Sequence, residues 1–198
     1  MNVKTFVASS ILSGSIFLSA AMVQAEPTVT LAEVTDVENF FGTRNVKVAF
    51  TIERNLYYVD FTETPAALHK IDAVTDAAIP VISPDGNYIA YATGTSSDAA
   101  TNVQSTAWIV EMSESATPVM VSEQGSGYVP RFVPGSLDPL EVVYATCASA
   151  LDNKVYVWDG CGKVVAVEIV DGQPGQERDI YTGGSYLGGI SYYEDYIG

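Results

Sequence analysis

The chain has few basic residues and few of the side chains that usually carry catalysis. Its 198 residues include 9 Lys and Arg against 24 Asp and Glu, one histidine and two cysteines, and its net charge is −15. Such a surface repels nucleic acid and anionic membranes, so neither is expected as a partner. A net charge of this sign is typical of a protein that an acidic surface keeps in solution. Cation binding is the more specific alternative interpretation.

Long helical patterns are also missing. Beyond the first 25 residues no apolar run approaches the roughly 18 residues that a membrane span requires, and no long segment repeats its apolar residues every 3.6 positions. Short runs rich in β-branched and aromatic residues, separated by polar or Pro/Gly residues, follow one another from Asn45 onward. This pattern predicts an all-β domain.

The first 25 residues have the pattern of a secretory signal peptide. Lys4 gives a short positive region, residues 6–23 are apolar and small, and Val23-Gln24-Ala25 is a small-x-small cleavage site. We expect cleavage before Glu26 and export to the periplasm or the extracellular medium. A membrane anchor is the alternative, and the serines within the apolar stretch argue against it. A lead-in of weak pattern would occupy residues 26–44.

Two cysteines in an exported chain predict one disulfide. Cys147 and Cys161 would close a loop of about 15 residues, worth about 3 kcal/mol in the chain-entropy model. Two cysteines with a distant histidine do not make a four-ligand zinc site, so no metal and no cofactor are expected.

The chain repeats itself at a period of fifty or so residues. Similar stretches begin at Ile79, Val129 and Leu187, which are 50 and 58 positions apart. A second set of markers keeps step: Asp60, Glu111 and Glu168 stand near the ends of their strands, 51 and 57 positions apart. Repeats of this length are a signature of solenoids and propellers.

Four short antiparallel strands in each unit predict a β-propeller blade. The predicted units span about 45–87, 88–140 and 141–195, and a fourth would start at 196–198. The chain is therefore expected to be a partial propeller over residues 45–198. It would be either the front part of a longer protein or a partial ring closed by self-association.

One turn carries a resemblance to a known family. Ser83-Pro84-Asp85-Gly86, followed by Asn87 and a hydrophobic strand, resembles the periplasmic WD40-like (PD40) repeat of TolB-type propellers. The later copies match it less closely. In this turn Pro84 presets φ, Asp85 can bond nearby backbone and Gly86 accepts a positive φ, so turn chemistry is favoured over calcium binding. The resemblance implies an envelope protein that works through protein contacts.

The third unit is predicted to contain an extra hairpin. Residues 154–158 lead into Asp159-Gly160, a hairpin turn signal, and the cysteine pair would pin this insertion to its blade. Trp108, Tyr156 and Trp158 are candidate binding residues that would offer an aromatic platform to a peptide or glycan. Ordinary packing of aromatic side chains is the alternative.

The sequence names no catalytic residues. No Gly-x-Ser-x-Gly elbow follows the leader, and His69 alternates with Leu68 and Lys70 on a predicted strand, which favours a solvated or half-buried side chain over a base. The leading hypothesis is an exported, non-catalytic module that presents a propeller face to a protein or other partner. The alternatives are the propeller of a larger secreted hydrolase or carbohydrate-active enzyme continuing after Gly198, and a self-assembling structural protein.

Overall fold

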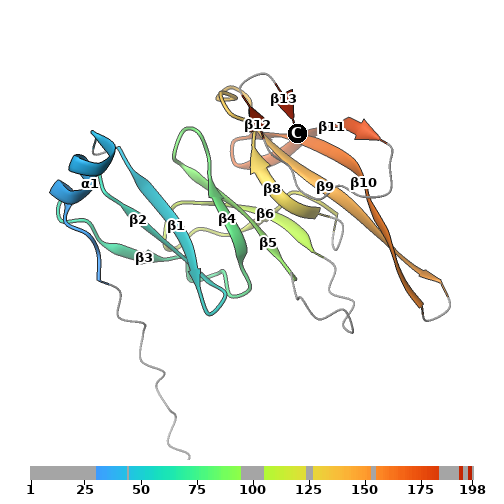
Figure 1. The fold of residues 1–198 in the computed structure, drawn as a ribbon, viewed down its shortest axis with the longest axis horizontal. Helices are drawn as coiled ribbons and strands as arrows, with labels where there is room; N and C mark the ends of the chain where they lie inside the picture. Colours follow the sequence, from blue (N-terminus) through green and yellow to red (C-terminus); the bar gives the residue numbers. More distant parts are fainter. Residues whose placement is uncertain are drawn as a thin grey trace, which may run out of the picture.

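The chain folds into antiparallel sheets that lie side by side in chain order (Figure 1). The structure is a computed structural model. For residues 147–152, 155–162, 192–193 and 196–197 it describes the backbone alone. The residues that it describes are 30–43, 45–94, 105–123, 127–152, 155–182, 192–193 and 196–197. Within these ranges the chain is mostly β, as predicted, with one short helix.

The first sheet has three strands in the order β1-β2-β3. They are β1 (Lys47–Ile52), β2 (Asn55–Asp60) and β3 (Leu68–Lys70). Glu53 and Arg54 connect β1 to β2, and both have a left-handed backbone with φ of 49° and 67°. Two successive positive φ angles are typical of the type I′ turn, whose twist matches that of an antiparallel pair.

The second sheet has four strands in the order β4-β5-β6-β7. They are β4 (Ala78–Ile82), β5 (Tyr88–Thr93), β6 (Thr106–Glu111) and β7 (Val119–Met120). The order follows the chain, so each strand pairs with the one before it.

The third sheet also has four strands, in the order β11-β10-β9-β8. They are β8 (Gly127–Phe132), β9 (Leu140–Asp152), β10 (Val155–Val170) and β11 (Gln173–Thr182). The loop between β10 and β11 is Asp171-Gly172, with φ of 51° and 71°. This Asp-Gly pair is a short-range hairpin signal, although this hairpin was not predicted from the sequence.

Two smaller elements flank the sheets. Helix α1 (Val34–Phe41) lies in the predicted lead-in, where no helix was expected; it ends at Gly42, whose left-handed backbone lets its N–H bond Glu38 O at 2.7 Å. Strand β12 (Tyr192–Tyr193) pairs with β13 (Tyr196–Ile197). The fourth unit expected to start at residues 196–198 stays a prediction.

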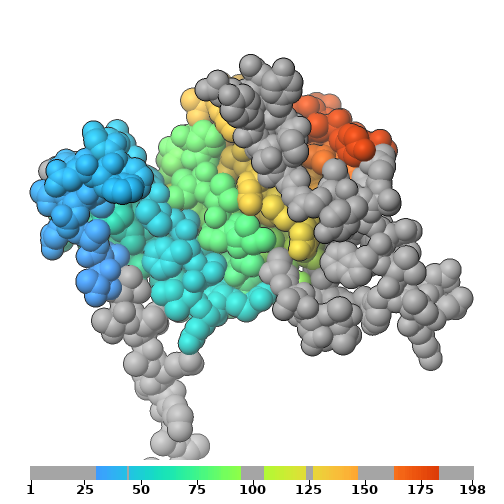
Figure 2. All heavy atoms as spheres, viewed as in Figure 1, coloured from blue at the N-terminus to red at the C-terminus, as the bar shows by residue number. Residues whose placement is uncertain are grey.

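The second sheet is covered on both faces by its neighbours. Successive side chains of β5 point to opposite faces of the sheet, so they enter two different apolar clusters. Ile89 and Tyr91 belong to an apolar cluster shared with the first sheet, and Ala90 belongs to one shared with the third. On the first-sheet side the cluster holds Leu56, Tyr58, Ile71, Val74 and Ala77. On the third-sheet side it holds Phe132, Leu140, Val142, Tyr144, Val165, Val167 and Ile169. Figure 2 shows the blue-to-cyan, green and yellow-to-orange parts of the chain adjoining one another.

The three sheets share a register that the sequence markers predicted. The acidic markers Asp60, Glu111 and Glu168 lie on β2, β6 and β10. Each pairs with the first or second residue of the strand that precedes it in the chain. These pairs are Lys47 with Asp60, Tyr88 with Glu111, and Glu141 with Glu168. The predicted equivalence of the three marker positions is therefore confirmed, and β1, β5 and β9 are corresponding strands.

Two strands belong to different sheets from those expected. Residues 79–82 were predicted to end the unit 45–87, but β4 pairs with β5 and begins the second sheet. In the same way β8, placed by the sequence in the unit 88–140, pairs with β9. The reason is that the turn at residues 83–87 closes a tight hairpin, and a tight hairpin joins neighbouring strands of one sheet.

The hairpin of the third sheet turns at a different place from the one predicted. Asp159 and Gly160 lie inside β10, where the pairing with β9 shifts register between Trp158 and Cys161. The strands connect instead between Asp152 and Val155. An Asp-Gly pair can therefore mark an irregularity within a strand as well as a turn.

Candidate functional site

The Ser83–Asn87 turn is held by its own side chains. Asp85 Oδ1 accepts hydrogen bonds from the Ser83 hydroxyl and from the Asn87 backbone N–H at 3.1 Å, and Asn87 Nδ2 donates to Oδ2 at 3.0 Å. Burial favours a raised pKa at Asp85, but the bonds from Ser83 and Asn87 outweigh it and hold the pKa below its usual value. Gly86 has φ of 73°, as the turn prediction required.

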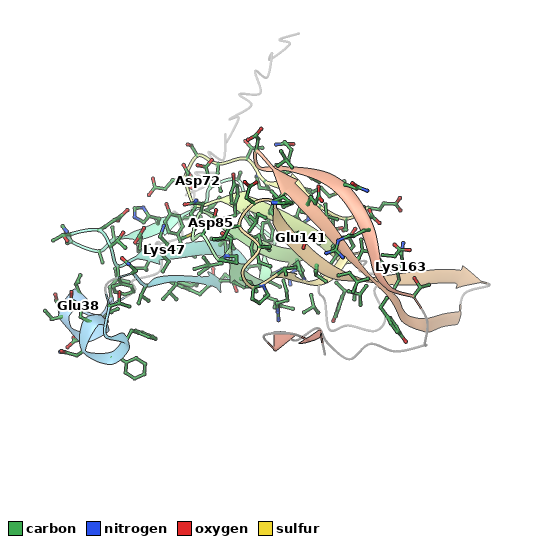
Figure 3. The ribbon with its side chains drawn as sticks, turned by 90° about the horizontal axis from the view of Figure 1, so that it is seen from above. Glu38, Lys47, Asp72, Asp85, Glu141 and Lys163 are labelled. Atoms are coloured by element: carbon green, nitrogen blue, oxygen red, sulfur yellow. The ribbon has the colours of Figure 1, made fainter. Side chains whose placement is uncertain are left out.

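Lys47 connects this turn to the first sheet. Its Nζ donates to Gly86 O at 3.0 Å and lies 3.1 Å from Asp60 Oδ2. Asp60 also accepts from the Thr62 backbone N–H at 2.8 Å and hydroxyl at 2.6 Å. Burial again favours a raised pKa, yet these bonds and Lys47 lower the pKa of Asp60. Figure 3 labels Lys47 beside Asp85.

The only histidine of the chain lies between two glutamates. His69 Nε2 is 2.9 Å from Glu63 Oε2, and Nδ1 is 2.9 Å from Glu114 Oε1. Glu63 lies in the connection between β2 and β3, whereas Glu114 lies in the connection between β6 and β7. The histidine side chain is 19% exposed, and those of Glu63 and Glu114 are 43% and 62% exposed.

An aromatic ring forms the floor of this cluster. Tyr58 stands opposite His69 in the ladder of β2 and β3, and their rings stack with centroids 4.7 Å apart and planes 18° apart. Burial, followed by the charges of Glu114, Glu63 and Asp60, raises the pKa of Tyr58. Burial favours a lowered pKa at His69, but the hydrogen bonds and charges of Glu63 and Glu114 outweigh it, so that the pKa of His69 is raised.

The Glu63–His69–Glu114 cluster was not predicted from the sequence. The pattern around His69 predicted a solvated or half-buried histidine, and the side chain is indeed half-buried. Glu114 is 45 positions away in the sequence, and its approach depends on how two sheets pack. No local pattern signals such a contact.

The three predicted aromatic binding residues are not brought together by described contacts. Trp108 is half-buried in β6, packs against the cluster shared by the first two sheets, and donates from Nε1 to Thr93 Oγ1 at 3.0 Å. This environment is that of a packed side chain. Tyr156 and Trp158 lie on β10, where the structure gives the backbone only.

The two cysteines face each other across the ladder. Cys147 on β9 is the direct partner of Cys161 on β10, between two shifts of register. Their side chains lie outside the described atoms. The predicted disulfide stays a prediction, and the backbone pairing is compatible with a bridge between neighbouring strands.

Two further observations bear on the types of site. In the described part of the chain, no group of three or more His, Cys, Asp or Glu side chains is arranged to hold a metal ion. No helix in that part combines the length and apolar character that crossing a membrane would need.

Comparisons with known proteins add little to this geometry. No family model matches the chain, and no curated protein matches it. One similar solved structure is an acylaminoacyl peptidase from Pyrococcus horikoshii, with 13% sequence identity and a TM-score of 0.36. The match covers 72% of this chain but only 26% of the peptidase. A likeness at that level carries no argument about activity.

Proposed function

We propose that the chain is an exported, non-catalytic module of a β-propeller, and that it presents a face of its sheet array to a protein partner in the cell envelope or outside the cell. The observation that carries the proposal is the repeated register of the three sheets. Corresponding strands recur in corresponding places, and the middle sheet is covered on both faces by its neighbours. Repeated sheets that bury their faces against one another are how a propeller builds its core.

The polar residues of the candidate site support a scaffold rather than a reactive centre. Lys47 and His69 each join the first sheet to the second through hydrogen bonds. Both ring nitrogens of His69 lie at hydrogen-bond distance from carboxylates, so neither nitrogen is left to activate a serine or cysteine nucleophile. The resemblance of Ser83-Pro84-Asp85-Gly86 to the repeat of TolB-type propellers supports the same proposal, because those propellers act through protein contacts.

Export and partner binding can be tested together in the cell that makes the protein. We expect the mature chain to begin at Glu26 in the exported fraction, by intact mass. Cross-linking in living cells is expected to join it to a discrete protein. That protein, once purified, is expected to bind the purified chain saturably.

The same purified chain should be assayed against aryl esters, aminoacyl anilides and aryl glycosides. Turnover that persists through purification would contradict a non-catalytic module and favour the hydrolase alternative. Light scattering tests the third hypothesis, because a mass of several copies in the absence of any partner would favour self-assembly. A chain retained in the cytoplasm with residues 1–25 intact would contradict export.

A further inference from the structure

The geometry of His69 specifies how many protons its ring carries. Both ring nitrogens lie 2.9 Å from carboxylate oxygens, and an ionised carboxylate can only accept a hydrogen bond. A neutral imidazole has one N–H and one bare nitrogen, so one of the two contacts would place lone pair against lone pair. Both contacts are hydrogen bonds when the ring is an imidazolium, which donates from both nitrogens.

The two contacts differ in what they connect. Glu63 and His69 both belong to the first sheet and its loops, so their contact fixes the connection from β2 to β3. Glu114 belongs to the second sheet, so its contact with His69 crosses the junction of the two sheets. A backbone bond lies beside this crossing, from Asp72 N–H to Glu114 O at 3.2 Å.

We propose that Glu63, His69 and Glu114 form a pH-dependent latch, which ties the connection between β6 and β7 to the first sheet while His69 is protonated and loosens when His69 loses its proton. The latch holds the edge of the junction, whereas the apolar cluster of Leu56, Ile71 and Ile89 holds its interior. Loss of the proton therefore loosens the loop without separating the sheets.

The charges around His69 favour this role. Glu63, Glu114 and Asp60 are acidic groups on the elements that face the Tyr58–His69 stack, and Asp72 follows two positions after Lys70, the strand neighbour of His69. The face of Tyr58 also favours a cation stacked on it. The hydrogen bonds and charges of Glu63 and Glu114 raise the pKa of His69, which is the direction that a protonated ring requires.

The direction of the pH effect follows from linkage. Because the pKa of His69 is raised in the folded chain from its ordinary value of 6.5, its stabilisation is complete below 6.5 and is lost as the pH rises through the folded value. The latch is therefore closed in mildly acidic medium and open in alkaline medium. An exported protein would experience this change, since its surroundings follow the external pH.

The titration of His69 is the first test and needs no variant. As the chain has one histidine, a single Hε1 resonance reports it by NMR. We expect a pKa above 6.5 in the wild-type chain, a lower pKa in Glu114→Gln, and an unchanged pKa in the control Glu111→Gln, which removes the same charge three positions earlier. A wild-type pKa at or below 6.5, or equal values in the two variants, would overturn the latch.

The second test measures the junction itself. Hydrogen exchange at the Asp72 amide reports the bond to Glu114 O. The ratio of its protection in wild type to that in His69→Gln is expected to fall about two- to fivefold between about pH 5.5 and pH 8.5, the range expected for a partly exposed ion pair. Using a ratio removes the intrinsic pH dependence of exchange. A ratio that stays constant across this range, in two folded proteins, would show that His69 does not hold the junction.

Discussion

Ile79 and Val129 adopt the same unusual backbone conformation in corresponding strands. Their φ angles are 55° and 49°, each precedes a proline, and each lies where the strand shifts register against its neighbour. Positive φ is rare for β-branched residues, because the branched side chain crowds the backbone. These two positions are the predicted starts of two sequence copies. They therefore share a backbone irregularity as well as a sequence pattern. The third predicted start, Leu187, lies outside the described residues.

The turns that follow these strands give a matched pair of glycines. Gly86 and Gly135 have φ of 73° and 77°. An added Cβ would meet only the Lys47 side chain at 3.5 Å in the first case and nothing within 4 Å in the second. We therefore expect Gly86→Ala and Gly135→Ala each to lower the free energy of unfolding by about 1 kcal/mol, through backbone strain alone. Urea denaturation measures both, and asparagine, which tolerates this conformation better, should cost less at each position. An alanine variant as stable as wild type would contradict the assigned turn.

The hydrogen bonds of Asp85 predict an acid-dependent contribution to stability. Its pKa is lowered from 3.8, so its stabilisation is present above 3.8 and is lost as the pH falls through the lower folded value. We expect Asp85→Asn to lower the free energy of unfolding at pH 6 by about 1 kcal/mol. The difference in free energy of unfolding between wild type and this variant should become smaller below pH 3. Unfolding midpoints of the two proteins at a series of pH values measure this. Asp171→Asn, an exposed change in another turn, serves as the control.

The fully buried side chain of Leu56 predicts a large cost for its truncation. It lies in the cluster shared by the first two sheets and is 0% exposed, whereas Leu137 is 61% exposed. Leu56→Ala should lower the free energy of unfolding by about 2–5 kcal/mol, and Leu137→Ala should change it by less than about 0.5 kcal/mol. Denaturant titration compares the two. Similar costs for both leucines would mean that Leu56 is not interior.

The proposed export predicts that Cys147 and Cys161 are oxidised to a disulfide. Their direct pairing between β9 and β10 supports a bridge that links neighbouring strands. Without reductant, a thiol-alkylating reagent should add no mass to the unfolded mature chain; after reduction it should add two labels. The chain-entropy model gives about 3 kcal/mol of stabilisation for a loop of this size, lost on reduction. Two labels without reductant would contradict the disulfide.

Much of the strand pattern could be predicted because each strand and turn depends on residues that are close together in the sequence. Short apolar runs bounded by turn residues gave the positions of most strands, and Pro84, Asp85 and Gly86 gave the chemistry of one turn. The helix α1 was missed because its eight residues carry too short a pattern. Val34, Val37 and Phe41 recur at helical spacing, but they span only two turns, and within the helix only Val37 is buried while Phe40 is 82% exposed.

The grouping of strands and the polar contacts could not be read in the same way. Whether residues 78–82 join the sheet before or after them depends on pairing, which a period of fifty residues leaves undetermined. The approach of Glu114 to His69 depends on two sheets packing against each other, and no motif in either segment encodes it. By contrast Asp171-Gly172 was a readable hairpin signal.

In a row of three sheets the middle sheet packs against a different neighbour on each face, and methyl NOE spectroscopy of the chain tests this arrangement most directly. Ile89 and Ala90 are adjacent on β5, yet they belong to different apolar clusters. We predict that the methyl groups of Ile89 show NOEs to Leu56 and Ile71 of the first sheet, and that the methyl group of Ala90 shows NOEs to Val142 and Val165 of the third. The row of repeated sheets would be contradicted if both residues showed NOEs to the same neighbouring sheet. It would also be contradicted if Ala90 showed no NOE to the third sheet.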